Sequence, residues 1–219
     1  MVSFIYLHGF ASSPQSRKAQ VLGDRFAALN VPLHRPDLNA DDFSHLTLSR
    51  QIAQVEALLP PAPEPTILIG SSFGGLTAAW LGDRHPQIEK LVLLAPAFGF
   101  LDHWLPKLGE AALQHWRDTG YYSVYHYRDA TQIPLHYGFI TDNQRYDDTI
   151  LQRPVPTLIL HGHHDEVIPF NASQAYAATR PWVTLIPLDS DHTLSNVDAE
   201  IWAAIQSFCF EPAAETARE

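Results

Sequence analysis

The sequence predicts an α/β fold: a doubly wound, mainly parallel sheet of about six strands with a helical cap insertion. Two observations support this prediction. Short apolar runs rich in β-branched residues alternate along the chain with amphipathic helical patterns. The strand-like runs are also apolar throughout, which is typical of parallel strands that helices cover on both faces of the sheet.

Each expected element follows from one such run. Strands are expected at Val2–Leu7, Val31–Arg35, Thr66–Ile69, Leu91–Ala95, Thr157–Leu160 and Val183–Pro187. Helices are expected at Ser16–Leu29, Leu46–Leu59, Phe73–Leu81, Phe170–Thr179 and Ser195–Phe208. Right-handed crossovers would bring the carboxyl ends of all these strands to one edge of the sheet, where folds of this class build their sites.

One segment, Ala97–Arg153, interrupts the alternation of strands and helices. It is rich in Trp, Tyr and Phe and is too long for a plain connection between two strands. We expect a mostly helical cap over the site, within a single domain spanning residues 1–219; the alternative is additional packing against the core. The polar tail Glu211–Glu219 is expected to fray.

Composition limits the classes of partner. With 219 residues, 46% hydrophobic and 17% charged, the chain suits one globular domain with a large core. The net charge of −10 and the lack of a basic block argue against nucleic-acid and anionic-membrane partners. No run is long enough for a membrane span, no signal peptide is evident, and the single cysteine, Cys209, cannot form an internal disulfide. A cytoplasmic location is therefore expected.

The most informative motif is Gly70-Ser-Ser-Phe-Gly74, between an expected strand and an expected helix. G-x-S-x-G in this context is typical of a nucleophile elbow, a tight turn that lifts a serine hydroxyl clear of the sheet. Gly70 and Gly74 flank Ser72 because a Cβ at either position would collide where strand and helix nearly touch. Ser72 is the expected nucleophile. The alternatives are a turn without chemistry and a phosphate cradle, although no Gly-Lys-Ser/Thr follows.

A reactive serine needs a general base, and the base needs an acid that orients it. Asp165 follows the expected strand at Thr157–Leu160, and His192 follows the one at Val183–Pro187. The chain order Ser, Asp, His is the order found with this type of elbow. We therefore expect Asp165 to be the acid and His192 the base.

Other residues near the same sheet edge compete for these two roles. The alternative acids are Asp147, Asp148, Glu166, Asp189 and Asp191. The alternative bases are His8, His161, His163 and His164, none of which lies in the loop after the last strand. His8 is expected instead to be a structural hydrogen-bonding residue.

The turn after the first strand, His8-Gly-Phe10, is placed to stabilise a developing oxyanion. The backbone N–H of Phe10 is one expected donor, and that of Phe73, directly after the proposed nucleophile, is the second. Both donors belong to the backbone, so a side-chain substitution would not remove them.

With these motifs in place, the sequence resembles the α/β-hydrolase superfamily and, within it, the small YqiA-type serine esterases. The resemblance rests on Tyr6–Ala19, Gly70–Gly75, Asp165–Pro169 and Ser190–Leu194, and the first block is the most specific. It implies a Ser72 nucleophile with Asp165 and His192, and ester hydrolysis without a metal or organic cofactor. The long aromatic insertion departs from the smallest relatives.

The expected function is therefore hydrolysis of a small-molecule carboxylic ester or thioester through an acyl-enzyme, with an apolar or aromatic acyl group. Acyl transfer, carbon–carbon bond hydrolysis and a lyase reaction could use the same three residues. A metal-dependent hydrolase is a further alternative, because His161, His163 and Asp165 form the start of a dinuclear zinc motif. In that motif Glu166 stands where another histidine is needed. A catalytically silent binding protein is the remaining possibility.

Overall fold

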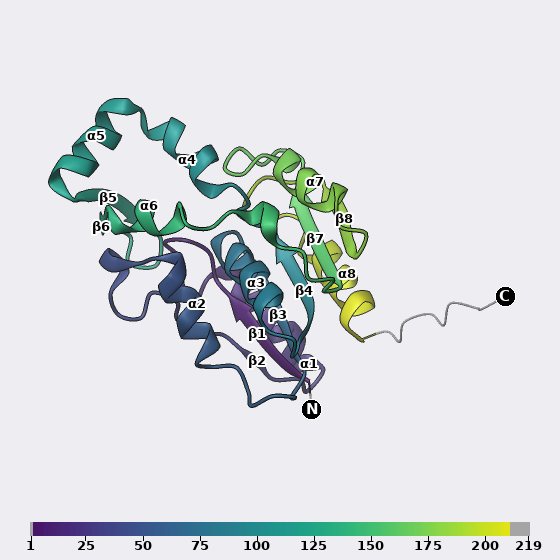
Figure 1. Cartoon of the computed structure of the whole chain (residues 1–219). Helices are drawn as coiled ribbons and strands as arrows, with labels where there is room; N and C mark the ends of the chain where they lie inside the picture. Colours follow the sequence, from purple (N-terminus) through teal and green to yellow (C-terminus); the bar gives the residue numbers. More distant parts are fainter. Residues whose placement is uncertain (1, 211–219) are drawn as a thin grey trace.

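A six-stranded sheet with the order β2-β1-β3-β4-β7-β8 forms the centre of the molecule (Figure 1). The computed structural model describes residues 2–210, so the tail Glu211–Glu219 lies outside the described residues. All neighbouring strands of this sheet are parallel, which confirms the predicted fold class. The strands are β1 (Ser3–Leu7), β2 (Leu33–His34), β3 (Thr66–Ser71), β4 (Ile88–Leu94), β7 (Thr157–Gly162) and β8 (Val183–Leu188).

Helices cover both faces of this sheet. One face packs against α1 (Arg17–Ala28) and α8 (Asp198–Phe210). The other packs against α2 (Leu48–Glu56), α3 (Phe73–Arg84) and α7 (Phe170–Ala178). Among residues 2–210, none of the helices combines the length and the apolar character needed to cross a bilayer.

The continuously apolar strands fill two cores at once. Successive side chains of a strand point to opposite faces of the sheet. In β3, Leu68 belongs to the core beneath α2 and α3, whereas Ile67 and Ile69 belong to the core beneath α1 and α8. This explains why the strand-like runs of the sequence do not alternate with polar residues.

Local capping accounts for one boundary that differs from the prediction. Helix α2 begins at Leu48, two residues later than the expected start at Leu46, after the short 3-10 helix η1 (Phe43–His45). The hydroxyl of Thr47 accepts a hydrogen bond from the Arg50 N–H at 3.0 Å and so fixes the first turn.

The segment between β4 and β7 contains helices and a β-hairpin that was not expected. Its elements are α4 (Phe100–Leu108), α5 (Glu110–Thr119), β5 (Tyr121–His126), β6 (Thr131–His136), α6 (Gly138–Asn143) and η2 (Asp148–Ile150). Figure 1 shows α4 and α5 extending away from the central sheet. Hydrogen bonds join this insertion to loops at the carboxyl edge. Among them, the Tyr127 N–H donates to the Ala11 carbonyl at 2.9 Å, and Lys107 Nζ donates to the Val167 carbonyl at 3.0 Å.

Candidate active site

Ser72 occupies a strained turn between β3 and α3. Its backbone has φ +52° and ψ −117°, a region that residues with a side chain rarely adopt. A Cβ on Gly70 would lie 2.4 Å from the Gly74 carbonyl oxygen, and a Cβ on Gly74 would lie 2.2 Å from the Leu7 carbonyl oxygen. Both contacts are far below van der Waals distance, which explains why only glycine fits on either side of Ser72.

The structure brings Ser72, His192 and Asp165 together in one hydrogen-bonded chain. The Ser72 Oγ lies 3.0 Å from Nε2 of His192, and Nδ1 of His192 lies 2.7 Å from Oδ2 of Asp165. Ser72 follows β3, Asp165 follows β7 and His192 follows β8, so the parallel sheet converges these distant residues at one edge. The imidazole is partly exposed whereas the carboxylate is buried.

Four groups donate hydrogen bonds to the Asp165 carboxylate. Oδ1 accepts the backbone N–H groups of Val167 and Ile168, each at 2.8 Å, and Oδ2 accepts from His161 and His192 at 3.0 and 2.7 Å. Burial alone would raise the pKa of Asp165, but these hydrogen bonds outweigh burial and hold the pKa well below its ordinary range. Asp165 is therefore ionised at neutral pH and oriented towards His192.

His161 supports Asp165 and does not face Ser72. It is fully buried, its Nε2 lies 3.0 Å from both Asp165 Oδ2 and the Ile168 carbonyl, and its Nδ1 lies 2.7 Å from Ser173 Oγ. The carboxylate and the carbonyl can only accept, so Nε2 carries the proton and Nδ1 accepts from the Ser173 hydroxyl. His161 was expected only as an alternative base, and its place in the sequence does not by itself indicate this supporting role.

The other alternative acids make different contacts. Asp189 is exposed and pairs with His164, Asp191 accepts from Thr193, and the Glu166 side chain is exposed. Asp147 accepts from Thr149, and Asp148 accepts from Trp80 and Gly99. Within residues 2–210, His192 hydrogen-bonds to Asp165 and to none of these five.

The alternative bases are also accounted for. His8 is buried, accepts the Leu38 N–H at Nε2 at 2.9 Å and lies 2.9 Å from the Gly9 carbonyl through Nδ1, the structural role expected for it. His163 is exposed beside Phe170. Among the residues described here, no group of three or more His, Cys, Asp or Glu side chains is arranged to hold a metal ion, so the zinc alternative gains no support.

The loop after β1 lies directly against the elbow. A Cβ on Gly9 would come within 3.3 Å of the Ser72 Cβ. Within residues 2–210, the backbone N–H groups of Phe10 and Phe73 donate to no other protein atom. The Phe10 ring packs among aromatic side chains of the core and the insertion, with ring centroids 5.2 to 6.2 Å away. This packing fixes the backbone of Phe10, and both N–H groups are left free to bind a ligand oxygen.

Residues 3–209 match a family described as an uncharacterised protein family, UPF0227. The chain belongs to UPF0227. No curated protein is similar enough in sequence to match it. Solved structures with the α/β-hydrolase fold do match this UPF0227 protein along most of its length.

Three of these structures illustrate the likeness. A putative hydrolase from Agrobacterium vitis S4 is 25% identical with a TM-score of 0.81, and the match covers 94% of this chain and 87% of that one. Alpha/beta hydrolase domain-containing protein 10 from mouse is 21% identical with a TM-score of 0.77, over 94% and 88%. Est1E from Butyrivibrio proteoclasticus, bound to ferulic acid, is 17% identical with a TM-score of 0.77, over 95% and 88%.

A lysine beside the elbow of the UPF0227 protein was not predicted as a site residue. Lys18 Nζ donates a hydrogen bond at 3.0 Å to Oγ of Ser71, the residue that precedes Ser72. Burial lowers the pKa of Lys18 to about 8, although the charge of Asp165 opposes this effect. Lys18 falls within the Tyr6–Ala19 block that carried the resemblance, but nothing in that block alone indicates that its ammonium reaches Ser71.

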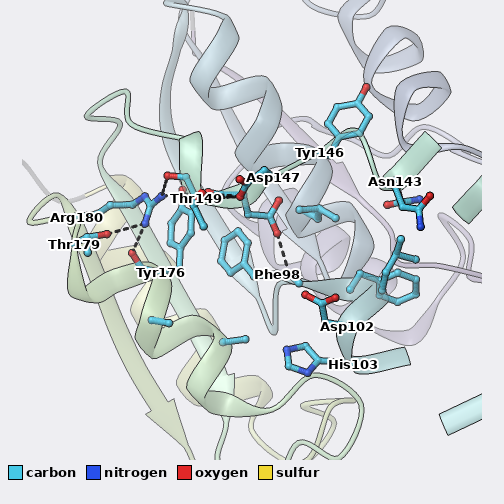
Figure 2. Close-up of a pocket in the computed structure, with 18 of the residues that line it drawn as sticks. Phe98, Asp102, His103, Asn143, Tyr146, Asp147, Thr149, Tyr176, Thr179 and Arg180 are labelled. Atoms are coloured by element: carbon cyan, nitrogen blue, oxygen red, sulfur yellow. Dashed lines mark hydrogen bonds between the residues drawn. The ribbon is translucent and has the colours of Figure 1, made fainter. Parts of the chain in front are cut away.

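A cavity of about 770 Å³ lies next to the site (Figure 2). Its walls come from α3, α4, α7 and the segment around η2, and neither Ser72, Asp165 nor His192 lines it. Phe98 and Tyr176 stack in its wall at 4.0 Å, and Asp148 accepts from the Gly99 N–H at 2.9 Å. Burial raises the pKa of Asp148 to about 6. The cavity begins behind the elbow, because Leu76 in its wall donates its N–H to the Ser72 carbonyl at 3.1 Å.

Proposed function

We propose that this UPF0227 protein is a serine hydrolase of carboxylic esters or thioesters, with Ser72 as nucleophile, His192 as base and Asp165 as orienting acid. The observation that carries the proposal is the continuous hydrogen-bonded chain from Ser72 Oγ through His192 to Asp165. The strained backbone of Ser72 adds support, because strain of this kind concentrates at functional sites.

The proposed mechanism follows from the direction of these hydrogen bonds. His192 Nε2 takes the proton of Ser72 as Oγ attacks the acyl carbonyl carbon. The ionised Asp165 keeps the other imidazole proton on Nδ1 and stabilises the imidazolium. The Phe10 and Phe73 N–H groups then bind the oxyanion, for which they have no competing protein acceptor among the described residues.

Collapse of the tetrahedral intermediate completes the acylation step. The leaving alcohol or thiol takes the proton from His192 and departs, leaving the acyl group on Ser72. Water, deprotonated by His192, then attacks the acyl-enzyme and releases the carboxylic acid. No step needs a cofactor.

We propose an apolar or aromatic acyl group as the substrate class. The loop that carries Phe10 is surrounded by the rings of Phe100, Trp104 and Phe139, so the approach to the proposed oxyanion site is apolar. The structurally similar Est1E was solved with ferulic acid, an aromatic acid, which is consistent with this class.

Labelling with a fluorophosphonate probe tests the nucleophile. We expect the wild type to be labelled and Ser72→Ala not to be, while Ser123→Ala, which changes an exposed serine of β5, keeps full labelling. Labelling that survives in Ser72→Ala would refute the proposal. A panel of p-nitrophenyl esters of increasing chain length, with one matched thioester, then defines the acyl group and the bond cleaved. Activity that is unchanged by a chelator would exclude the metal-dependent alternative.

A further inference from the structure

Lys18 is unusual in two respects: its position in α1 and the environment of its ammonium. It is the second residue of α1, whose first turn contains no acidic residue, and the positive end of the helix dipole disfavours a cation there. Its side chain is also half-buried, yet the hydrogen bond from its ammonium to Ser71 joins the charge to a neutral hydroxyl. Within residues 2–210, no carboxylate hydrogen-bonds to Lys18 Nζ. A buried charge without a direct counter-ion is costly, and such groups concentrate at functional sites.

The charges around Lys18 come from several elements. Asp165 after β7, Asp191 after β8 and Asp198 at the start of α8 all favour its charged form, whereas the neighbouring Arg17 disfavours it. Asp198 is already paired with Arg17 at 3.1 Å, and Asp191 is bound by Thr193. Tyr6 of β1 faces the same Ser71 hydroxyl, and burial raises the pKa of this phenol to about 12, so it stays neutral. Asp165 is thus the one carboxylate of the three that belongs to the proposed catalytic chain.

We infer that Lys18 is a positioning residue for Ser72: its ammonium form holds Ser71, and through it the end of β3 that carries the proposed nucleophile. This inference rests on the proposed function. A charge-assisted hydrogen bond is roughly twice as strong as one between neutral groups. Loss of the Lys18 proton therefore loosens Ser71 without removing any member of the catalytic chain.

The inference gives the reaction an alkaline limit. The pKa of Lys18 is lowered to about 8, so the ammonium is lost between roughly pH 7 and 9. Hydrolysis should therefore decline across this range, with kcat falling and KM staying constant, because the contact of Lys18 is with Ser71 and its proposed effect is on the position of Ser72. A purely structural lysine would not produce such a limb.

The test measures kcat and KM for p-nitrophenyl acetate from pH 6 to 10 in four proteins. In the wild type we expect an alkaline limb with a midpoint near pH 8. Lys18→Arg keeps its charge throughout this range and should lose the limb. Lys18→Met should have a kcat about tenfold lower, a KM within twofold of the wild type, and no limb. Arg25→Met, which changes an exposed cation in the last turn of the same helix, should keep the wild-type profile.

The outcomes separate this inference from the proposed function. Ser72-dependent hydrolysis with the same alkaline limb in wild type and Lys18→Arg would overturn the role of Lys18 and leave the proposed function standing. A wild type without Ser72-dependent hydrolysis would overturn both. If Lys18→Met does not fold, the comparison of the wild type with Lys18→Arg still tests the inference.

Discussion

The backbone of Ser72 gives a stability test that is independent of substrate. At φ +52° and ψ −117° the residue is strained unless it is glycine. Ser72→Gly and Ser72→Ala both remove the hydroxyl and its 3.0 Å hydrogen bond to His192, so that loss cancels between them. What remains is the strain, present in the alanine variant and relieved in the glycine variant.

The expected difference follows from two opposing contributions. Strain at such a position costs about 1–3 kcal/mol. Glycine lowers stability by roughly 0.4–1 kcal/mol through the greater freedom of the unfolded chain. Ser72→Gly should therefore be more stable than Ser72→Ala by about 0.5–2 kcal/mol, and under the proposed function neither variant should hydrolyse esters.

Urea unfolding, followed by tryptophan fluorescence, measures this difference. Equal m-values in the two variants would show that the compared states are the same. Ser123→Gly and Ser123→Ala, on the exposed face of β5, are the matched control pair. Here the glycine variant should be less stable than the alanine variant by about 0.5–1 kcal/mol. If Ser72→Gly were no more stable than Ser72→Ala, the argument that the elbow stores strain would be wrong.

Three further outcomes are expected. Asp165→Asn should lower kcat by on the order of 10⁴-fold, the effect of the same change in a well-studied protease triad. A loss of kcat of less than tenfold, measured with p-nitrophenyl acetate, would argue against Asp165 as the acid. Gly74→Ala should lower the free energy of unfolding by about 3 kcal/mol because its Cβ meets the Leu7 carbonyl, whereas Gly23→Ala meets only the mobile end of an arginine and should be nearly neutral in the same urea titration. The pKa of Asp148 is raised to about 6, so the folded state binds more protons than the unfolded state between about pH 4 and 6. Ionisation of this carboxylate therefore lowers the free energy of unfolding as pH rises through that range. The stability of Asp148→Asn relative to wild type should therefore rise by up to about 3 kcal/mol from pH 4 to 7, and a difference that does not change with pH would contradict it.

The parallel sheet was predictable because its signal is local. Each strand is a short apolar run, and burial on both faces requires that pattern wherever the strand lies. The convergence of Ser72, Asp165 and His192 could also be predicted, because the carboxyl ends of parallel strands share one edge. Once the sheet has formed, the number of residues between them in the sequence does not affect how close they lie in space.

The hairpin β5–β6 was missed because its signal competes with a stronger one. Its strands contain Tyr, Val and Ile, which favour strands, but the length and aromatic content of the whole insertion favour a helical cap. In β5 every second residue is more buried than its neighbours, the pattern of a half-buried strand. The sequence itself does not show this alternation, because tyrosine stands at both inward and outward positions of β5.

The roles of His161 and Lys18 could not be read from the sequence for a different reason. His161 lies near the end of β7 and His163 follows the strand, and the structure buries the first against Asp165 while the second faces solvent. Lys18 lies on a helix whose own pattern places charged residues outside. Its contact with Ser71 depends on how closely α1 approaches the end of β3, which is a tertiary property.

Ser72, Lys18 and Asp165 each occupy an environment that is unfavourable for that type of residue. Ser72 adopts a backbone conformation that its side chain disfavours, Lys18 buries a cation at a helix N-terminus, and Asp165 is a buried carboxylate. The strain at Ser72 and the burial of the Lys18 charge each lower stability on their own, and the burial of Asp165 would do so without the four hydrogen bonds that hold its pKa down. All three meet at one edge of one sheet. Unfavourable features gathered at a single point are expected at a functional site, and they support the proposal that Ser72 is held ready for reaction.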